Sequence, residues 1–450
     1  MRIIRQKITN KKTMAEHTIK IIGGGLAGCE SALQLLERGF KVEMYEMRPQ
    51  KTTGAHKTDD LAELVCSNSL KSCEPCTASG LLKEELDLLG CKLLKIAREC
   101  AVPSGSALAV DRQKFSEAVE RALFAYDNFT LVREEVKTLD DERPTIVATG
   151  PLTSDTLAEQ VGKITGKDRL YFYDAIAPIV EFDSIDMSKA YFGGRYGKGG
   201  EDYLNLPMQK DEYEIFYNEL VNAQTVVLHD FEKKELFDGC MPIEEMAKRG
   251  SDTIRFGPLK PVGLRNPQTG EKAYAVVQLR KENVAGDCYN LVGFQTNLTY
   301  GEQKRVFRLI PALKNAEFVR YGIMHRNTYI NAPDVIDGTF RLKGNKTLYI
   351  AGQLSGVEGY VESIMSGLIA GQAMACELCG EEYQIPSEYT IIGALCRYVS
   401  QMSLDFKPMN ANLGILPSIT GIRDKSKRKQ AYHDRAISEL RRMLNTEYKS

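Results

Sequence analysis

Two of the eleven cysteines stand in sequence contexts that favour a reactive thiol. Cys66 lies in ELVCSNSLKS, surrounded by small polar residues and followed by Lys71. Cys240 lies in LFDGCMPIEEMAKRG, in a glycine turn directly before Pro242 and a predicted helix start. A thiol at a helix N-terminus has a lowered pKa and is more often the nucleophilic thiolate. Either context alone also fits an inert core thiol, so covalent catalysis and simple packing both stay open.

Four other cysteines form two Cys-x-x-Cys pairs, Cys73/Cys76 and Cys376/Cys379. A zinc ribbon places two such pairs about 15–20 residues apart, whereas these lie in opposite halves of the chain, so we expect no metal site. The first pair lacks the strand-to-helix setting of a thioredoxin-type site, which makes disulfide chemistry a less favoured alternative. The second pair lies on a predicted helix and is expected to fill space.

A glycine-rich turn near the start of the chain predicts a dinucleotide site. Residues 18–28 read TIKIIGGGLAG, and they are followed by ESALQLLERG with helical spacing and by the strand KVEMYEM. In such a unit Gly23 makes the tight turn, Gly25 lets the backbone approach a pyrophosphate, and Gly28 lets helix and strand pack closely. Glu46 ends the second strand and can accept a hydrogen bond from a ribose hydroxyl, which favours FAD or NAD over NADP.

Two later segments favour FAD over NAD. Residues 144–150 read PTIVATG, a buried strand, and residues 347–371 read TLYIAGQLSGVEGYVESIMSGLIAG, a strand, a glycine-rich turn and a small-residue helix. Two-domain flavoproteins resemble this order, with the late helix N-terminus laid against the flavin and pyrophosphate. The predicted cofactor-binding residues are therefore Gly23, Gly24, Gly25, Leu26, Ala27, Gly28, Glu46, Gly352 and Gly359.

Two segments are locally basic. Residues 303–326 carry six basic residues against one acid, with interleaved aromatic residues, and residues 421–442 carry eight basic residues against three acids. Basic side chains bind phosphates and aromatic rings stack on unpaired bases, so RNA contact is one interpretation and a solvated helix face is the other. The predicted RNA-binding residues are Lys304, Arg305 and Arg308.

The composition is that of an ordinary globular protein. The chain has 450 residues, 43% hydrophobic and 26% charged, with a formal net charge of −1. This excludes a disordered chain, a collagen-like repeat and a coiled coil, and any polyanion site must be a local basic face. The odd cysteine count and the lack of an N-terminal apolar segment favour a cytoplasmic location. We expect no membrane contact, since no apolar stretch is long enough to span a bilayer.

These elements predict an α/β fold, namely a Rossmann-like FAD-binding domain with an inserted α+β mixed-sheet domain. Residues 1–14 are expected to be a disordered basic tail, with Met14 as an alternative start. The FAD-binding domain is predicted to be discontinuous, over residues 15–180 and 334–450, and the inserted substrate domain to span residues 181–333. Amphipathic helices are expected over residues 80–94 and 114–125. The sequence gives no oligomeric state.

Several blocks together resemble one family. They are GGGLAGCESALQLLERGFKVEMYEMRP, AELVCSNSL, GLLKEEL, VPSGSALAVDR, FDGCMPIEEMAKRG, TNLTYGEQKRVFRLIPAL, AEFVRYGIMHRNTYIN and LYIAGQLSGVEGYVESIMSGL. Over about residues 18–440 the chain resembles the folate- and FAD-dependent tRNA (uracil-5-)-methyltransferases. It departs from them in the GGG turn, the basic N-terminal extension and the CEPC insertion.

The resemblance implies methylation of carbon 5 of a T-loop uridine in tRNA. Methylenetetrahydrofolate would be the carbon donor, reduced FAD the hydride source, and NADH or NADPH the reductant. Uracil carbon 5 becomes nucleophilic only after a thiolate adds to carbon 6, and a base must later remove the carbon-5 proton. The resemblance assigns these two roles to Cys66 and Cys240, without deciding which cysteine is the nucleophile.

Three alternatives remain at this point. The same chemistry can act on a ribosomal RNA uridine, because target choice depends on surface shape. The protein can instead be a plain NAD(P)H-dependent flavin oxidoreductase or disulfide reductase, or a non-catalytic RNA binder that senses a nucleotide. A plain oxidoreductase would need neither the Cys240 block nor a basic C-terminal helix.

Overall fold

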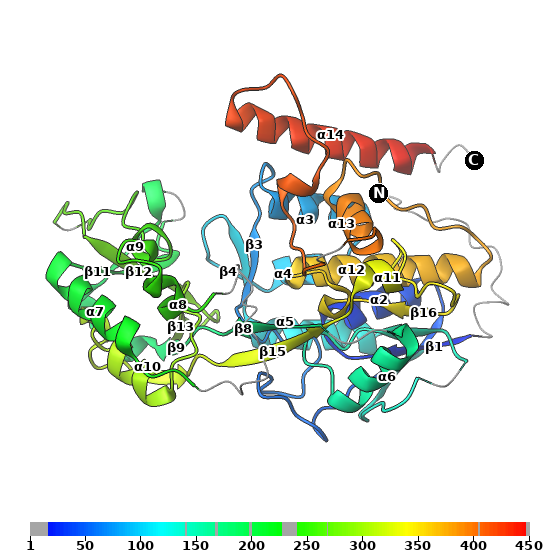
Figure 1. The fold of residues 1–450 in the computed structure, drawn as a ribbon, viewed down its shortest axis with the longest axis horizontal. Helices are drawn as coiled ribbons and strands as arrows, with labels where there is room; N and C mark the ends of the chain where they lie inside the picture. Colours follow the sequence, from blue (N-terminus) through cyan, green and yellow to red (C-terminus); the bar gives the residue numbers. More distant parts are fainter. Residues whose placement is uncertain are drawn as a thin grey trace.

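The computed structural model describes residues 17–139, 142–166, 170–197, 200–226, 241–267, 269–403 and 406–446. Cys240 and the predicted basic tail lie outside these residues. The described chain forms two lobes of unequal size, joined by the strands β8 and β15, as Figure 1 shows. No helix in the described ranges is long and apolar enough to cross a membrane.

The larger lobe is built on a five-stranded parallel sheet with the order β16-β7-β1-β2-β6. Its strands are β1 (Thr18–Ile22), β2 (Lys41–Tyr45), β6 (Phe129–Val132), β7 (Thr145–Val147) and β16 (Leu348–Ile350). The inner strand β7 is a continuous apolar and β-branched run and β1 is interrupted only by Lys20, as suits a sheet buried on both faces, whereas the residues of β2 alternate between buried and more exposed positions. Because β7 and β16 come from distant parts of the sequence, the sheet is completed only after the chain returns from the second lobe.

Helices α2 (Leu26–Glu37) and α12 (Tyr360–Leu378) pack closely together in this lobe. A Cβ on Gly367 would lie 2.2 Å from the Ala27 carbonyl oxygen, and Ser31 Oγ donates to the carbonyl of Gly367 at 2.8 Å. The small residues of α12 therefore serve the close approach of two helix backbones. The predicted small-residue helix is present, and its residue Gly367 packs against the first turn of α2.

The other elements of the larger lobe surround this centre. The helices are α3 (Ala78–Leu88), α4 (Leu93–Glu99), α5 (Arg112–Phe124), α6 (Asp155–Thr165), α11 (Ala332–Val335), α13 (Ile391–Ser400) and α14 (Lys425–Thr446). A three-stranded antiparallel sheet consists of β3 (Ser69–Ser72), β5 (Ala107–Val110) and β4 (Ala101–Val102). One cluster of buried apolar side chains, from Ile19 to Leu440, is the core of this lobe.

The helix predicted over residues 80–94 is wrong in extent, because the chain forms α3 and α4 with a break between them. Gly90 adopts φ +81°, a left-handed conformation that ends α3. The buried carboxylate of Glu30 then accepts the backbone N–H groups of Lys92 and Leu93, at 3.1 and 2.8 Å. A side chain from α2 thus starts α4, which the local pattern could not reveal.

The smaller lobe contains a six-stranded sheet with the order β10-β11-β12-β13-β9-β14. Its strands are β9 (Ile179–Glu181), β10 (Tyr191–Phe192), β11 (Tyr203–Met208), β12 (Ala275–Lys281), β13 (Cys288–Leu291) and β14 (Phe318–Arg320). Every described pairing is antiparallel, so the expectation of a mixed sheet was wrong for this lobe. Among these strands, only β10–β11 and β12–β13 are neighbours that also follow one another directly in the chain; helices lie between β11 and β12, and β9 pairs with the distant β13 and β14.

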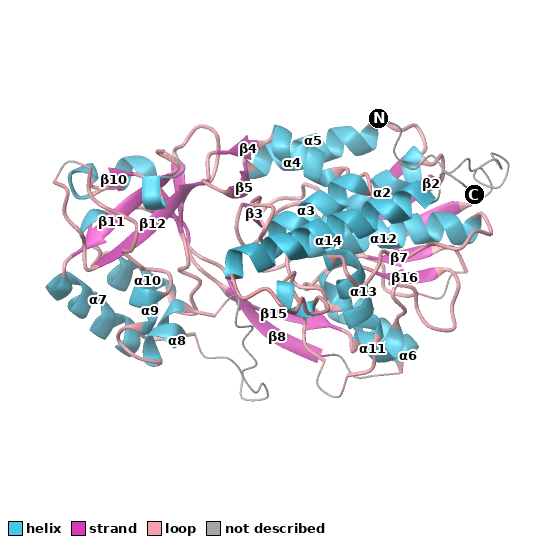
Figure 2. Cartoon of the chain, turned by 90° about the horizontal axis from the view of Figure 1, so that it is seen from above, coloured by secondary structure: helices cyan, strands magenta, loops and turns pink. Residues whose placement is uncertain are grey.

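Four helices accompany this sheet, namely α7 (Lys210–Asn222), α8 (Ile243–Lys248), α9 (Thr253–Phe256) and α10 (Tyr300–Phe307). A second cluster of buried apolar side chains, from Ala177 to Ala316, is separate from the first. The chain enters this lobe along β8 (Leu170–Ala175) and leaves it along β15 (Met324–Tyr329), and the two strands pair antiparallel. Figure 2 shows this ribbon crossing between the lobes.

Candidate active site

The first glycine turn is closed on its protein side and open on the other. Gly23 has φ +105°, and a Cβ there would lie 2.5 Å from the Ala148 carbonyl oxygen. A Cβ on Gly28 would lie 2.0 Å from the carbonyl oxygen of Gly23, whereas a Cβ on Gly25 would have no atom within 4 Å. The tight turn at Gly23 and the close packing at Gly28 agree with the geometry, and the approach of a pyrophosphate to the open space beside Gly25 stays a prediction.

The neighbouring predicted residues complete the turn. Gly24 donates its N–H to Glu46 Oε2 at 2.9 Å, and a Cβ on Gly24 would lie 2.4 Å from the Leu61 side chain. Leu26 and Ala27 are buried in the first turn of α2. Their side chains pack into the protein, so a ligand here would meet the backbone and the positive end of the α2 dipole.

Glu46 is buried, with 6% of its surface exposed. Its Oε1 accepts hydrogen bonds from Arg48 Nε at 2.9 Å and from the Arg48 backbone N–H at 3.1 Å. Burial acts to raise the pKa of Glu46, but the hydrogen bonds and charge of Arg48 outweigh it and hold the pKa below its usual value. Glu46 is therefore ionised and remains a hydrogen-bond acceptor at neutral pH.

A hollow extends from the glycine turn along the carboxyl ends of β1, β2 and β7, the usual ligand position in such sheets. Its lining includes four carboxylates, Glu46, Glu63, Glu134 and Glu135. Arg48 is the only lysine or arginine among its described lining residues, and it also pairs with Glu63 at 3.0 Å. With its one guanidinium already engaged, the hollow suits an unphosphorylated ribose better than a 2′-phosphate.

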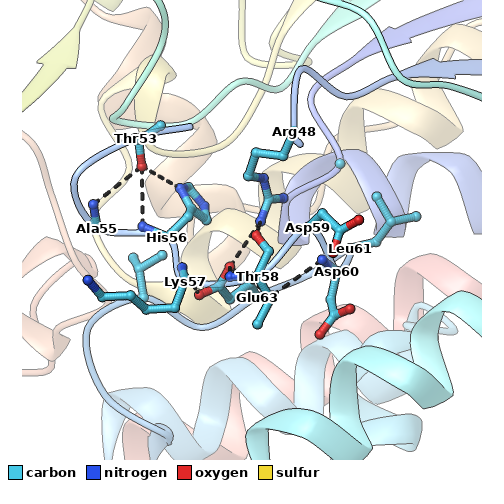
Figure 3. Close-up of polar contacts among 12 residues, drawn as sticks. Arg48, Thr53, Ala55, His56, Lys57, Thr58, Asp59, Asp60, Leu61 and Glu63 are labelled. Carbon is cyan, nitrogen blue, oxygen red and sulfur yellow. Dashed lines mark hydrogen bonds and ion pairs between the residues drawn. The ribbon is translucent and has the colours of Figure 1, made fainter. Parts of the chain in front are cut away.

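A loop after β2 joins this hollow to the segment that carries Cys66. Figure 3 shows Thr53 turned toward Ala55 and His56, and Arg48 turned toward Glu63. Glu63 also accepts the backbone N–H groups of Lys57 and Thr58, at 2.8 and 3.2 Å. The chain Glu46–Arg48–Glu63 therefore fixes the loop only three residues before the cysteine.

Cys66 lies where this loop meets the start of α12. The backbone N–H groups of Cys66 and Ser67 donate to the Tyr360 hydroxyl oxygen, at 2.7 and 3.2 Å. Tyr360 is the first residue of α12, and burial together with the Cys66 sulfur raises its pKa, so the phenol is neutral. Cys66 Sγ lies 3.9 Å from the Ala175 carbonyl oxygen, at the end of β8. The thiol thus sits beside the strand that leads to the smaller lobe.

Two guanidinium groups hold the backbone around Cys66. Arg112 Nη1 donates to the Leu64 carbonyl at 2.7 Å and Nη2 donates to the Cys66 carbonyl at 3.4 Å. Arg320, on β14 of the smaller lobe, donates to the Val65 carbonyl at 2.8 Å. Three consecutive carbonyl groups are therefore fixed by side chains from two different lobes.

Positive charge exceeds negative charge near this cysteine. Arg112 Nε lies 2.8 Å from Glu282 Oε2, close enough for an ion pair though not aligned as a hydrogen bond. Burial acts to lower the pKa of Arg112, but Glu282 raises it above its usual value. Arg280 donates to Asn68 Oδ1 at 3.0 Å, and burial lowers the pKa of Arg320, as does the nearby charge of Arg112. Three guanidinium groups share one carboxylate, so an anion is favoured at this site.

The two late glycines also lie where the fold needs them. Gly359 has φ +120° and precedes Tyr360, and a Cβ there would lie 2.2 Å from Glu362 Oε2. Gly352 donates its N–H to Ser366 Oγ at 2.7 Å, and a Cβ on it would lie 3.2 Å from the Ala27 Cβ. Gly352 thus lies between Ala27 at the start of α2 and Ser366 of α12. Gly359, by contrast, shapes the first turn of α12 itself. Their contact with a cofactor stays a prediction.

The three residues predicted to bind RNA are not equally available. Arg305 forms ion pairs with Glu219 and with Glu302, the latter at 2.8 Å. Arg308 donates to the Ala316 carbonyl at 2.8 Å. Lys304 is exposed and has no ion pair within the described residues. Two of the three predicted residues on the basic face of α10 are thus already held by Glu302, by Glu219 of α7 or by a backbone carbonyl.

Sequence reasoning missed Arg48, Arg112, Arg320 and Tyr360 as parts of this site. Arg48 follows Glu46 by two positions, and Tyr360 lies within the distinctive block VEGYVES, so both were visible as local signals. Arg112 and Arg320 had no such signal, because they act through contacts between distant segments. Cys240 belongs to the undescribed range 227–240, so its role remains a prediction.

The parallel sheet, the glycine turn and the inserted antiparallel lobe define a dinucleotide-binding protein of two lobes. The fold is similar to that of GidA from Aquifex aeolicus, with a TM-score of 0.69 over 96% of this chain and 73% of that one, at 16% identity. The family model described as "Glucose inhibited division protein A" matches residues 18–382.

Curated relatives are much closer in sequence. Methylenetetrahydrofolate–tRNA-(uracil-5-)-methyltransferase TrmFO of Natranaerobius thermophilus is 54% identical, over 95% of this chain and 99% of that protein. The proteins of the same name from Acetivibrio thermocellus and Bacillus subtilis are 53% and 51% identical, over 95% and 96% of this chain. The chain therefore belongs to the methylenetetrahydrofolate–tRNA-(uracil-5-)-methyltransferase family, within the broader glucose inhibited division protein A family.

Proposed function

We propose that this protein is a folate-dependent enzyme that methylates carbon 5 of a T-loop uridine in tRNA. The family relationship over nearly the whole chain supports the reaction class. The observation that carries the chemistry is the position of Cys66, fixed between the N-terminus of α12 and the smaller lobe by Tyr360, Arg112 and Arg320. A reactive thiol at the junction of a nucleotide site and a second lobe can meet both cofactor and substrate.

The residues around the hollow fit FAD. The backbone of the turn at Gly23, Gly24 and Gly25 and the start of α2 would hold the pyrophosphate, and Glu46 would hold the ribose. The open space beside Gly25 is the cradle that a Cβ would fill. When bound in its reduced form, FAD supplies the hydride that completes the methyl group. NADH or NADPH is the proposed reductant and methylenetetrahydrofolate the proposed carbon donor.

The proposed covalent steps use two thiols. One cysteine thiolate adds to carbon 6 of the uracil, forming a C–S bond, and the electrons of the 5,6 double bond pass to carbon 5 and the carbonyl at position 4. Carbon 5 then bonds to the methylene carbon of the folate donor. A base removes the carbon-5 proton while the bond between the methylene carbon and the folate nitrogen breaks, so tetrahydrofolate leaves and an exocyclic methylene remains on carbon 5. A hydride, which reduced FAD would supply, adds to this methylene to give the methyl group, and the thiolate leaves carbon 6 as the 5,6 double bond re-forms. We propose Cys66 and Cys240 for these two roles and leave the order open.

The guanidinium groups suit this chemistry. Addition of a thiolate to uracil places negative charge on the ring, and fixed positive charge near the reacting atoms stabilises such an intermediate. Arg112 and Arg320 also fix the backbone on both sides of the thiol through the carbonyls of residues 64–66. We propose that they position Cys66, with Glu282 holding Arg112 from the other lobe.

The proposed RNA target is tRNA, and the names of the close relatives support it over a ribosomal RNA. A plain flavin oxidoreductase is not favoured by the same relationship. We propose the cytoplasm as the location, which agrees with a tRNA substrate and with eleven cysteines in the chain.

The direct test is to incubate the protein with methylenetetrahydrofolate, NADPH and unmodified tRNA, and to map 5-methyluridine. A parallel reaction with unmodified ribosomal RNA distinguishes the two targets. We expect the modification at a single T-loop uridine of the tRNA. Methylation of ribosomal RNA alone would reassign the substrate, and oxidation of NADPH without any methylated RNA would favour the oxidoreductase.

A further inference from the structure

The first two turns of α14 and the residues before them carry a dense group of cations. We call Arg423, Lys425, Lys427, Arg428 and Lys429 the α14 basic patch. All are exposed except Lys429, which is half-buried, and none forms an ion pair within the described residues. Asp424 is the only acid in this stretch, and its carboxylate accepts the Lys427 backbone N–H at 2.7 Å as the helix cap. The patch is thus a local positive surface on a chain of nearly zero net charge.

The helix that carries the patch is firmly docked. Ala436, Ile437 and Leu440 are buried in the core of the larger lobe. His433 Nε2 lies 2.7 Å from Glu84 on α3, and Arg435 Nη2 donates to the Pro417 carbonyl at 2.6 Å. The cations at the start of α14 are therefore presented in a fixed arrangement, as expected of a binding surface and not of a frayed end.

The patch adjoins the turn after β3, the strand that follows Cys66 in the chain. Cys76 Sγ donates to Gln430 Oε1 at 3.0 Å, which places the turn after β3 against the helix directly beyond Lys429. Cys76 follows Cys66 by ten positions, so these two Cα atoms are at most about 36 Å apart. Figures 1 and 2 both show the N-terminal end of α14 pointing toward the smaller lobe, and Figure 1 shows this end above β3.

The arginines at the end of α10 differ from the cations of this patch because they already have carboxylate or carbonyl partners. Arg305 is held by Glu219 and Glu302, and Arg308 is turned toward Ala316 and Glu317. A cation that already has a carboxylate partner must give up that partner to bind a phosphate, whereas an exposed, unpaired cation exchanges only water and counterions. The α14 basic patch is therefore the better phosphate-binding surface.

We infer that the α14 basic patch binds the sugar–phosphate backbone of the RNA substrate while the reacting uridine reaches Cys66. The inference rests on the proposed function for the identity of the RNA. Phosphate contacts position an RNA without reading its sequence, so this surface supplies affinity and orientation. Choice of the uridine then depends on the site between the lobes.

The test is the variant K425Q/K427Q/R428Q/K429Q, which keeps the Asp424 cap and uses a good helix former. Binding of unmodified tRNA is measured by fluorescence anisotropy from 50 to 200 mM salt, without folate or NADPH. Each lost phosphate contact should reduce the slope of log K against log salt by about 0.7–0.9, so the variant should lose about 3 units. Flavin content and the melting temperature should match those of the wild type.

A matched pair of double variants controls for net charge. K427Q/R428Q removes two cations from the patch, and R441Q/R442Q removes two exposed cations from the other end of the same helix. The first should reduce the slope by about 1.5 units and the second should leave it unchanged. An equal loss in both would mean a non-specific effect of charge and would overturn the inference. An unchanged slope in the quadruple variant would overturn it as well.

Two further outcomes separate this inference from the proposed function. If the wild type binds tRNA through the patch but forms no 5-methyluridine, the docking surface stands and the methylation proposal fails. If the wild type methylates tRNA and the quadruple variant does so with unchanged KM, the methylation proposal stands and the docking surface fails. Binding to phosphatidylglycerol vesicles is measured in parallel, and a loss of vesicle binding with intact tRNA binding would assign the patch to a membrane surface instead.

Discussion

The nucleotide hollow and the surroundings of Cys66 are neighbouring regions that are built in different ways. The turn at Gly23, Gly25 and Gly28 and the acid Glu46 come from one continuous strand–helix–strand unit. The backbone at Cys66 is held by Tyr360, which is 294 positions away, and by arginines from α5 and β14. A binding motif can thus be local in sequence, whereas the proposed reactive centre exists only when both lobes are assembled.

Arg48 links the two regions. It holds Glu46 in the hollow and Glu63 in the loop that leads to Cys66, and its side chain is almost fully buried. A local site and a tertiary site therefore share one ion-pair network. Variants in the hollow, at Cys66 or at Arg48 should show how much each contributes to flavin binding, methylation and stability.

The largest effect is expected when the local site is blocked. Gly25→Val would fill the space where the pyrophosphate approaches, so the purified protein should lose its flavin and all methylation. Absorbance at flavin wavelengths measures the loss. Gly301→Val is the control, because Gly301 on α10 is equally open and lies outside the hollow. A Gly25→Val protein with stoichiometric flavin would contradict the proposed cofactor position.

The next effect should separate the two regions. Cys66→Ala should abolish methylation and leave the flavin in place, because the thiol lies beside the hollow and does not line it. Cys240→Ala is expected to do the same. RNA that contains 5-fluorouridine should trap a covalent adduct, because its carbon-5 substituent cannot leave as a proton, and only the nucleophile variant should fail to form it.

Exposed Cys73 provides the control for this pair. Cys73→Ala should keep full methylation. Loss of activity in Cys73→Ala alone would revive disulfide chemistry at the Cys73/Cys76 pair. Full methylation by both Cys66→Ala and Cys240→Ala would rule out the covalent mechanism.

Removal of the link should damage both regions. Arg48→Gln leaves the buried carboxylates of Glu46 and Glu63 without their cation, and loss of one partner of a buried pair costs about 3–5 kcal/mol. Urea denaturation should show this loss, together with weaker flavin binding. Arg98→Gln breaks an exposed pair with Asp87 and should cost less than about 1 kcal/mol. Equal stability of the two variants would mean that the network does not connect the regions.

A smaller effect is expected at the tertiary site. Arg112→Gln should lower the kcat of methylation by about 10- to 100-fold with flavin retained, because it removes one charged donor from the Cys66 backbone. The double variant R112Q/E282Q relieves the unpaired buried carboxylate of Glu282. It should regain stability without regaining kcat. Recovery of both would mean that Arg112 has only a structural role.

The smallest effect concerns pH at the local site. The pKa of Glu46 is lower in the folded protein than in the unfolded chain, so its ionised form stabilises the fold above about pH 4.5. This contribution should be lost as the pH falls through the folded pKa. The difference in unfolding free energy between wild type and Glu46→Gln should therefore shrink on acidification from pH 6 to pH 3.5. A difference that grows instead would contradict the assigned ion pair.

The comparison also explains which predictions from sequence succeeded. The early strand–turn–helix–strand unit and the late strand–helix unit follow from backbone conformation and short-range periodicity, and the structure has both where they were predicted. The cofactor contacts of the glycines and of Glu46 stay predictions. The helix over residues 80–94 was wrong because Glu30, from another helix, starts α4. The mixed sheet of the smaller lobe was wrong because strand direction depends on connections that short strands do not reveal. The domain boundaries at residues 180 and 333 stay predictions.

The sequence by itself determined the dinucleotide motif, the family and the candidate thiols, because each of these is carried by residues adjacent in the chain. Only the tertiary structure decided what surrounds Cys66, since Arg112, Arg320 and Tyr360 meet it across long sequence separations. It also decided which basic segment is free to bind a polyanion. Arg305 and Lys427 look alike in a list of charges, but a carboxylate from α7 pairs with the first and no described carboxylate pairs with the second. Whether a cation is free to bind a phosphate depends on its distance from the nearest carboxylate, and that distance cannot be read from the order of residues.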